Sequence, residues 1–117
     1  MGKAVVFVVE DDADVRENLR DLLEDAGHVV SSASDGEEAL AQMKASSGPA
    51  VAIVDLQMPV MDGRELISAM RKSAELRLIP IIVLTGTGNT VVTGADCVLA
   101  KPYESSRLLA RVREFAP

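Results

Sequence analysis

Val51-Ala52-Ile53-Val54-Asp55, residues 51–55, is the stretch that decides the fold, because four apolar residues run directly into a carboxylate. A continuous apolar run of this length is typical of a strand that is covered on both faces. Pro59 and Gly63, which follow, are typical of a loop. A carboxylate at the end of a buried strand is costly unless a partner binds it or it reacts. Asp55 is therefore the first candidate for a functional residue.

Two other apolar runs also end on charged residues. The predicted strand at residues 4–9 is followed by Glu10 and Asp11, and the predicted strand Cys97–Ala100 is followed by Lys101. An acidic pair, a lone acid and a lone lysine, each at a strand end, indicate one site that handles a phosphoryl group and a divalent metal.

Strands and helices alternate along the chain. Apolar runs predict five strands, at residues 4–9, from 29, 51–55, 81–84 and 97–100. Apolar residues at helical spacing predict helices around residues 15–26, 39–43, 66–70 and 108–115. This alternation predicts an α/β fold with a doubly wound parallel sheet. At 117 residues and 48% hydrophobic content, one domain spanning residues 1–117 is expected.

In such a sheet the ligand site lies beyond the carboxyl ends of the strands. Glu10, Asp11, Asp55, Thr85 and Lys101 all fall at predicted strand ends. We therefore expect these five side chains to converge on one site.

The segment at residues 86–96 breaks the alternation. A parallel crossover usually takes a dozen or more residues and contains a helix. This one is barely long enough and is rich in glycine, threonine and valine, which are poor helix formers. We expect a loop, or one irregular turn, where a fourth helix would otherwise lie.

Several local signals predict turns and helix starts. Asp12 or Asp14 is expected to cap the first helix, and Ser34-Asp35-Gly36-Glu37 resembles a capping box that opens the second. Asp62-Gly63 is expected to form a turn that starts the third helix. A cis peptide bond before Pro102 would help to aim Lys101 inward.

Composition limits the possible functions. The net charge of −6, from 18 acidic and 12 basic residues, argues against direct nucleic-acid binding. The single Cys97 cannot form an internal disulfide, which favours a reducing, cytoplasmic setting. No apolar run approaches the length of a membrane span, and the first residues do not resemble a signal peptide.

Taken in order, these motifs make the chain resemble a receiver domain of the two-component response-regulator family. The matching pieces, spread over essentially the whole chain, are Val8-Val9-Glu10-Asp11-Asp12, Asp55, Met58-Pro59 with Asp62-Gly63, Leu84-Thr85-Gly86, Gly94-Ala95-Asp96 and Lys101-Pro102-Tyr103. The resemblance implies a flavodoxin-like sheet with strand order 2-1-3-4-5. It also implies a phosphoacceptor signalling domain, which assists its own phosphorylation and dephosphorylation, rather than an enzyme with a separate substrate.

The resemblance further implies a Mg²⁺ site. Asp11 and Asp55 would bind the metal directly, Glu10 through water, and the Gln57 main-chain carbonyl would be another ligand. The physics is consistent, because two carboxylates about 4 Å apart repel by roughly 4 kcal/mol at an effective dielectric of about 20. Such a cluster should bind a cation or hold a proton, and Mg²⁺ prefers hard oxygen ligands.

By the same resemblance, Asp55 accepts a phosphoryl group from a histidine kinase or a histidine phosphotransfer protein. Thr85 would donate a hydrogen bond to that group, and Lys101 would pair with it. A partner would approach past the first helix, and Arg16 and Tyr103 are among the candidate contacts. The kinase, the output and the oligomeric state are left open.

Two features depart from the family pattern. Val98 occupies the position where the family usually has Tyr or Phe, and the fourth helix of the usual output face is shortened or absent. The phosphorylation site is therefore complete while the ordinary output route is altered. We hypothesise that the loop at residues 86–96 is itself the mobile element.

Two other functions compete with a phosphorylated receiver. A Mg²⁺-dependent phosphohydrolase of the haloacid-dehalogenase type would need a second Asp where this chain has Gln57. A phosphorylation-independent receiver-like binding module would fit the missing helix and Val98. Turnover of small phosphomonoesters would favour the first, and metal binding without phosphoryl uptake would favour the second.

Overall fold

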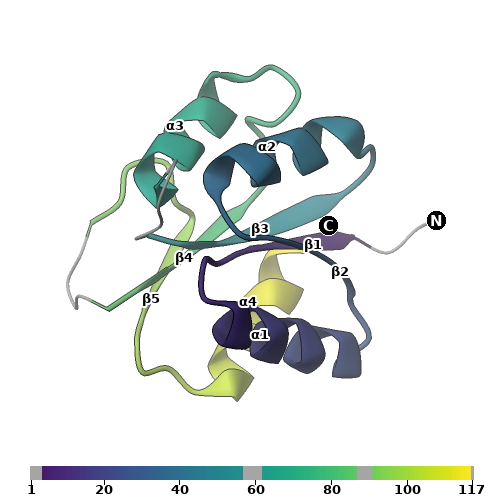
Figure 1. Ribbon diagram of the computed structural model, residues 1–117, viewed down its shortest axis with the longest axis vertical. Coiled ribbons are helices and arrows are strands. Elements are labelled where there is room, and N and C mark those ends of the chain that lie inside the picture. The colour runs from purple at the N-terminus through teal and green to yellow at the C-terminus, as the bar shows by residue number, and fades with distance from the viewer. Residues whose placement is uncertain (1–3, 57–61, 87–90, 117) are drawn as a thin grey trace.

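The computed structural model describes residues 4–56, 62–86 and 91–116, and its centre is a five-stranded parallel sheet (Figure 1). The strands are β1 Val5–Val9, β2 Val29–Ala33, β3 Ala50–Asp55, β4 Ile81–Thr85 and β5 Cys97–Ala100. Their order is β2-β1-β3-β4-β5, with every neighbouring pair parallel. The predicted fold class and strand order are confirmed.

Four helices cover the sheet in the described part of the chain. They are α1 Ala13–Asp25, α2 Gly36–Ala45, α3 Gly63–Lys72 and α4 Ser105–Phe115. In Figure 1, α1 and α4 lie on one face of the sheet and α2 and α3 on the other. None of the helices in the described residues has the length and apolar character needed to cross a membrane.

The two layers give the sheet two cores, which explains why the strands read as continuous apolar runs. Along β1, Val6 and Val8 belong to the core beneath α1 and α4, while Phe7 and Val9 belong to the core beneath α2 and α3. Successive side chains of a strand point to opposite faces, so a strand covered on both faces has no polar side. All six residues of β3 are buried.

Aspartates start three of the helices. Asp12 caps α1 and Asp62 caps α3, as two of the predicted signals require. The predicted capping box at Ser34–Glu37 is wrong by one residue. Asp35 is the N-cap of α2 and accepts a hydrogen bond from the Glu38 amide at 2.8 Å. Asp35 has extended backbone angles, as an N-cap residue requires, and its own carboxylate reaches the Glu38 amide.

The connection from β4 to β5 lacks a helix in its described residues, 86 and 91–96. This agrees with the expected loss of the fourth helix; residues 87–90 of the predicted loop lie outside the described part. Val92 is buried in the core beneath α3, and Gly94 has a φ of +92°. A Cβ on Gly94 would lie 2.8 Å from Ile67 Cγ2, so the connection packs directly against α3.

Candidate functional site

The carboxyl ends of the strands bring the predicted residues together. Glu10 directly follows β1, Asp55 ends β3, Thr85 ends β4 and Lys101 directly follows β5. Parallel pairing in register places these ends side by side, because Asp55 pairs with Leu84 and Thr85 pairs with Ala100. The expected convergence on one edge of the sheet is therefore present.

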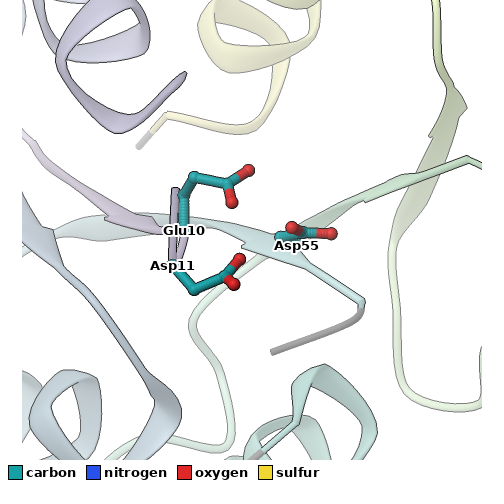
Figure 2. A group of neighbouring side chains, drawn as sticks. All are labelled: Glu10, Asp11 and Asp55. Atoms are coloured by element: carbon teal, nitrogen blue, oxygen red, sulfur yellow. The ribbon is translucent and has the colours of Figure 1, made fainter. Parts of the chain in front are cut away.

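Three carboxylates form a cluster at this edge. One oxygen each from Glu10, Asp11 and Asp55 lies within 4.8 Å of the other two. Figure 2 shows the Glu10 and Asp11 side chains leaving the end of β1 and extending toward Asp55 at the end of β3. Glu10 and Asp55 are buried, whereas Asp11 is exposed. The cluster therefore opens to solvent on the Asp11 side.

Glu10 is the most constrained carboxylate of the cluster. Its Oε2 accepts a hydrogen bond from the Asp12 amide at 3.1 Å, while its buried Oε1 has no hydrogen-bond partner among the described residues. The pKa of Glu10 is raised from 4.5 to about 7, mainly by burial; the Asp11 and Asp55 carboxylates also raise it, and the hydrogen bond from the Asp12 amide lowers it. A buried oxygen without a donor, beside two more carboxylates, suits a hard divalent cation.

Lys101 supplies the only ammonium ion paired with this cluster in the described residues. Its Nζ lies 3.6 Å from Asp55 Oδ1 and 3.8 Å from Glu10 Oε1. Its amide donates a 2.7 Å hydrogen bond to the Thr85 carbonyl, which fixes the backbone at the end of β5. The peptide bond to Pro102 is cis, as expected. The ammonium ion therefore lies between the Asp55 and Glu10 carboxylates.

Thr85 lies at the end of β4, next to this group, and only 3% of it is exposed. The strand places Thr85 beside Asp55 because β4 pairs with β3 up to Leu84. A threonine hydroxyl can donate one hydrogen bond. The sequence therefore located a hydroxyl at the correct edge of the sheet, and its predicted role toward a phosphoryl group stays a prediction.

The backbone at the start of α3 lies very close to the backbone at the end of β3, next to Asp55. The Gly63 amide donates a 3.0 Å hydrogen bond to the Leu56 carbonyl. A Cβ on Gly63 would lie 2.6 Å from the Asp55 carbonyl oxygen and 2.8 Å from the Leu56 Cα. Only glycine allows α3 to begin this close to the end of β3. Gln57, the remaining predicted metal ligand, lies outside the described residues.

Arg16 has a contact that sequence reasoning missed. Its Nη1 donates to the Glu10 carbonyl at 2.9 Å and, more weakly, to the Asp11 carbonyl at 3.4 Å. Arg16 was predicted only as a partner contact. The signal available in the sequence was its place one turn into the helix that follows the acidic pair.

Tyr103 and Val98 flank the Lys101 side of the site. Tyr103 is half-buried against the core beneath α1 and α4. Burial is the main cause that raises the pKa of Tyr103, and the charges of Glu10 and Asp55 add to it. Val98, at the position where an aromatic residue was expected, packs partly buried against the core beneath α2 and α3. Tyr103 therefore lies within the electric field of the acidic cluster.

Comparison with known proteins agrees with this geometry. A family model described as the response regulator receiver domain matches residues 6–113. The response regulator MprA of Mycobacterium ulcerans is 40% identical over 114 residues, which cover 92% of this chain and 48% of that protein. The probable transcriptional regulator ycf27 of Porphyridium aerugineum is 34% identical over 116 residues, covering 97% and 48% respectively. The chain thus spans about half the length of the curated relatives it matches.

Solved structures show the same similarity. The chemotaxis protein CheY4 of Vibrio cholerae matches with a TM-score of 0.87 and 33% identity, covering 97% of this chain and 99% of that one. The response regulator protein TrrA of Thermotoga maritima, in complex with Mg²⁺-BeF, matches with a TM-score of 0.85 and 27% identity, covering 96% and 98%.

Proposed function

This chain belongs to the response regulator receiver domain family, and we propose that Asp55 accepts a phosphoryl group in two-component signal transduction. Response regulators receive phosphoryl groups from histidine kinases. The donor proposed here is a histidine kinase or a histidine phosphotransfer protein, and the modified domain changes its interactions with partners. The proposed receiver unit is residues 1–117.

One observation carries this proposal. Asp55 is a buried carboxylate that lies beside two further carboxylates and 3.6 Å from an ammonium ion, which also pairs with Glu10 at 3.8 Å. A carboxylate that only stabilised the fold would need the cation alone. The extra carboxylates make the site suited to a divalent metal, and the lysine makes it suited to an anion. A site for both, next to a nucleophile, supports phosphoryl transfer.

The chain offers oxygen ligands that fit Mg²⁺. Glu10, Asp11 and Asp55 would hold the ion, and the Gln57 main-chain carbonyl is proposed as a further ligand. The buried Glu10 Oε1, which lacks a hydrogen-bond donor among the described residues, would gain a partner from the metal or its water. A similar domain, TrrA, was solved with Mg²⁺-BeF. When bound, the ion neutralises negative charge on the phosphoryl oxygens.

The transfer step then falls to this chain's own groups. An Asp55 carboxylate oxygen forms a bond to phosphorus while the phosphorus–nitrogen bond of the donor's phosphohistidine breaks. The imidazole nitrogen keeps that electron pair. Lys101 offsets the charge on one phosphoryl oxygen, and the Thr85 hydroxyl donates a hydrogen bond to another. The central strand β3 only positions Asp55, which is the main contribution expected when little covalent chemistry is needed.

Intact mass spectrometry after incubation with acetyl phosphate and Mg²⁺ tests the proposal. The expected result is one phosphoryl adduct that disappears in the Asp55→Asn variant and on chelation with EDTA. An adduct that persists in Asp55→Asn would assign the acceptor elsewhere. Metal binding without any adduct, from acetyl phosphate or from a purified kinase, would favour the phosphorylation-independent binding module instead.

A further inference from the structure

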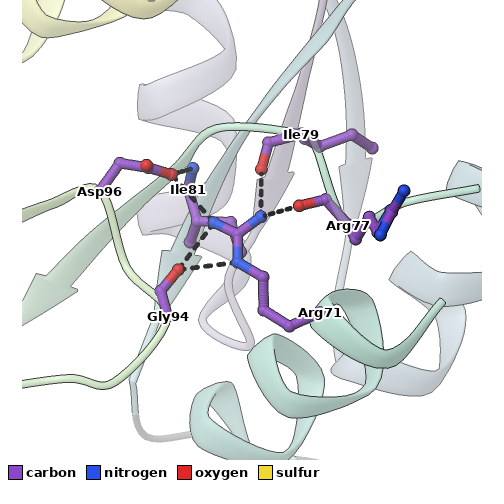
Figure 3. Close-up of polar contacts among 6 residues, drawn as sticks. All are labelled: Arg71, Arg77, Ile79, Ile81, Gly94 and Asp96. Atoms are coloured by element: carbon purple, nitrogen blue, oxygen red, sulfur yellow. Dashed lines mark hydrogen bonds and ion pairs between the residues drawn. The ribbon is translucent and has the colours of Figure 1, made fainter. Parts of the chain in front are cut away.

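One arginine joins α3 to the connection that replaces the fourth helix (Figure 3). Arg71, in the last turn of α3, donates from Nε and Nη2 to the Gly94 carbonyl at 2.9 and 2.7 Å. Its Nη1 donates to the carbonyls of Arg77 and Ile79 at 2.6 and 2.9 Å. Its Nη2 also pairs with Asp96 Oδ2 at 2.9 Å. A single guanidinium thus ties together α3, the approach to β4 and the approach to β5.

Asp96 extends this network into the sheet. Its Oδ2 also accepts a hydrogen bond from the Ile81 amide at 2.8 Å, and its own amide donates to the Ile81 carbonyl at 2.9 Å. Ile81 is the first residue of β4, and Cys97, the first residue of β5, directly follows Asp96. The ladder between the two strands therefore starts at an aspartate that Arg71 holds.

The strand that begins there is the one least supported by the sheet. β5 has four residues and pairs only with β4 in the described structure, whereas β1 and β3 each have two neighbours. In the described residues no helix precedes it to fix its start. A short strand with one neighbour has few hydrogen bonds to define its register. The start of β5 therefore depends on contacts outside the ladder.

Lys101 is placed by this register. Ala100 pairs with Thr85, and the Lys101 amide donates to the Thr85 carbonyl at 2.7 Å. The ammonium ion then lies 3.6 Å from Asp55 Oδ1. Any shift of β5 along β4 would carry Lys101 with it, because only four residues separate Asp96 from Lys101.

From these contacts we propose that Arg71 is a positioning residue, whose guanidinium fixes the start of β5 and thereby places Lys101 beside Asp55. The planar fork of arginine suits this task, because it reaches four carbonyl or carboxylate acceptors at once and keeps its charge. A lysine has the charge but not the fork. The proposal concerns Lys101 in the phosphoryl site, so its chemical readout rests on the proposed function.

The first measurement is independent of that function. Hydrogen exchange of the amides at residues 97–101 is compared between the wild type, Arg71→Ala and Arg71→Lys. Both variants are expected to exchange faster at these amides than the wild type. The amides of β1 and β3 should keep their wild-type protection once any change in global stability is subtracted. Equal acceleration across all strands would show that Arg71 stabilises the fold without positioning β5.

The second measurement reads the position of Lys101. Beryllofluoride, an analogue of the phosphoryl group, is titrated with excess Mg²⁺ and followed by NMR. Arg71→Ala is expected to weaken binding about tenfold, since a misplacement on the order of 1 Å can cost a site up to about 100-fold. In a Lys101→Ala background the same substitution should have almost no further effect, because the group it positions is gone. Additive losses in the double variant would overturn the proposal.

Two controls separate positioning from general loss of stability. Arg64→Ala removes another arginine of α3, one whose side chain makes no hydrogen bond or ion pair in the described residues, and should leave the affinity unchanged. Val112→Ala removes packing from α4 on the opposite face, where Val112 is fully buried. It should lower stability yet leave beryllofluoride affinity within about twofold, because it leaves the Arg71 contacts in place.

The outcomes distinguish the two proposals. Failure of the wild type to bind beryllofluoride with Mg²⁺ would contradict the proposed function, and the exchange data would still decide whether Arg71 fixes β5. Normal binding by the wild type with a Val112→Ala loss equal to that of Arg71→Ala would reject the positioning role alone.

Discussion

The two sides of the candidate site are supported in different ways. Glu10 and Asp55 follow or end β1 and β3, which are central strands with a neighbour on each side. Lys101 follows β5, an edge strand of four residues whose start is tied to α3 by Arg71. The acidic side is therefore fixed by backbone pairing on both edges of its strands, and the basic side by pairing on one edge together with a few side-chain contacts.

The difference in support matches the different electrostatic forces on the acidic and basic side chains. Carboxylates that repel one another must be held by a rigid frame, since the frame has to resist their mutual repulsion. A lysine that is attracted to its partners needs less support and can move when the charge at Asp55 changes. The arrangement predicts that perturbing the end of β3 affects the fold more strongly than the same perturbation in the β4–β5 connection.

Gly63→Ala gives the largest expected effect. The added Cβ would meet the Asp55 carbonyl at 2.6 Å, and because backbone must shift to accept it, we expect a loss of about 3 kcal/mol in the free energy of unfolding. Gly86→Ala is the matched change in the other region, where no atom of the described residues lies within 4 Å of the new Cβ. It should change stability by less than about 1 kcal/mol. Chemical denaturation measures both, and similar losses would remove the contrast between the two regions.

Glu10→Gln tests the cost of ionising a buried carboxylate within the acidic cluster. The pKa of Glu10 is raised from 4.5 to about 7 in the fold, so the folded protein binds more protons than the unfolded chain between these values. The free energy of unfolding of the metal-free wild type should therefore fall as the pH rises through this window. The variant lacks this dependence and should be more stable than the wild type at pH 8 by on the order of 2 kcal/mol.

Denaturation at about pH 5 and about pH 8, with and without Mg²⁺, checks this pH dependence. Saturating Mg²⁺ should reduce the advantage of Glu10→Gln at the higher pH, because the metal stabilises the ionised wild-type cluster. Glu17→Gln, an exposed change on α1, is the control and should show no pH-dependent difference. A constant difference between Glu10→Gln and the wild type across the pH range would contradict the burial argument.

Tyr103→Asp tests whether the surface next to Lys101 contributes to partner docking. Tyr103 lies half-buried next to Lys101 and in the field of the acidic cluster, where an added negative charge should disfavour a docked partner. Phosphoryl transfer from a histidine phosphotransfer protein should slow about tenfold, while labelling by acetyl phosphate should change by no more than about twofold. Rates from both donors are compared with those of Tyr103→Phe. Equal slowing with both donors would reject a docking role.

Arg16→Ala should have the smallest effect. Arg16 donates to the carbonyls of Glu10 and Asp11, but those residues are already positioned by the end of β1. We expect a loss of about 0.5 to 1 kcal/mol in stability. Arg111→Ala, which removes an exposed pair with Glu114 on α4, is the control and should cost less stability than Arg16→Ala. A loss as large as that of Gly63→Ala would show that the acidic side also depends on a single side chain.

Much of the candidate site was predictable because its residues sit at strand ends. Apolar runs located β3 and β4 from the pattern alone, and the charge or hydroxyl after each run marked Asp55 and Thr85. Parallel strands bring their carboxyl ends to one edge, so sequence order was enough to group these residues. Gln57, whose main-chain carbonyl is proposed as a ligand, lies outside the described residues, and the roles of the site residues stay predictions.

Contacts made by long side chains were less predictable. Nothing in the sequence distinguishes Arg71 from the neighbouring Lys72 at the end of α3, yet only the arginine reaches Gly94 and Asp96 in the described structure. The α2 cap was misplaced by one residue because Ser34 and Asp35 are both good capping residues. In each case several local choices were equally good, and the surrounding chain selected one.

The sequence by itself determined the sheet, its layering and the edge at which the site forms, because hydrophobic periodicity is a local property that can be recognised directly in the order of residues. Only the tertiary structure decided how Lys101 is held and why Gly63 must lack a side chain. Those features depend on distances of a few ångströms between residues far apart in the chain. Such distances are set when the layers pack, and no local pattern records them.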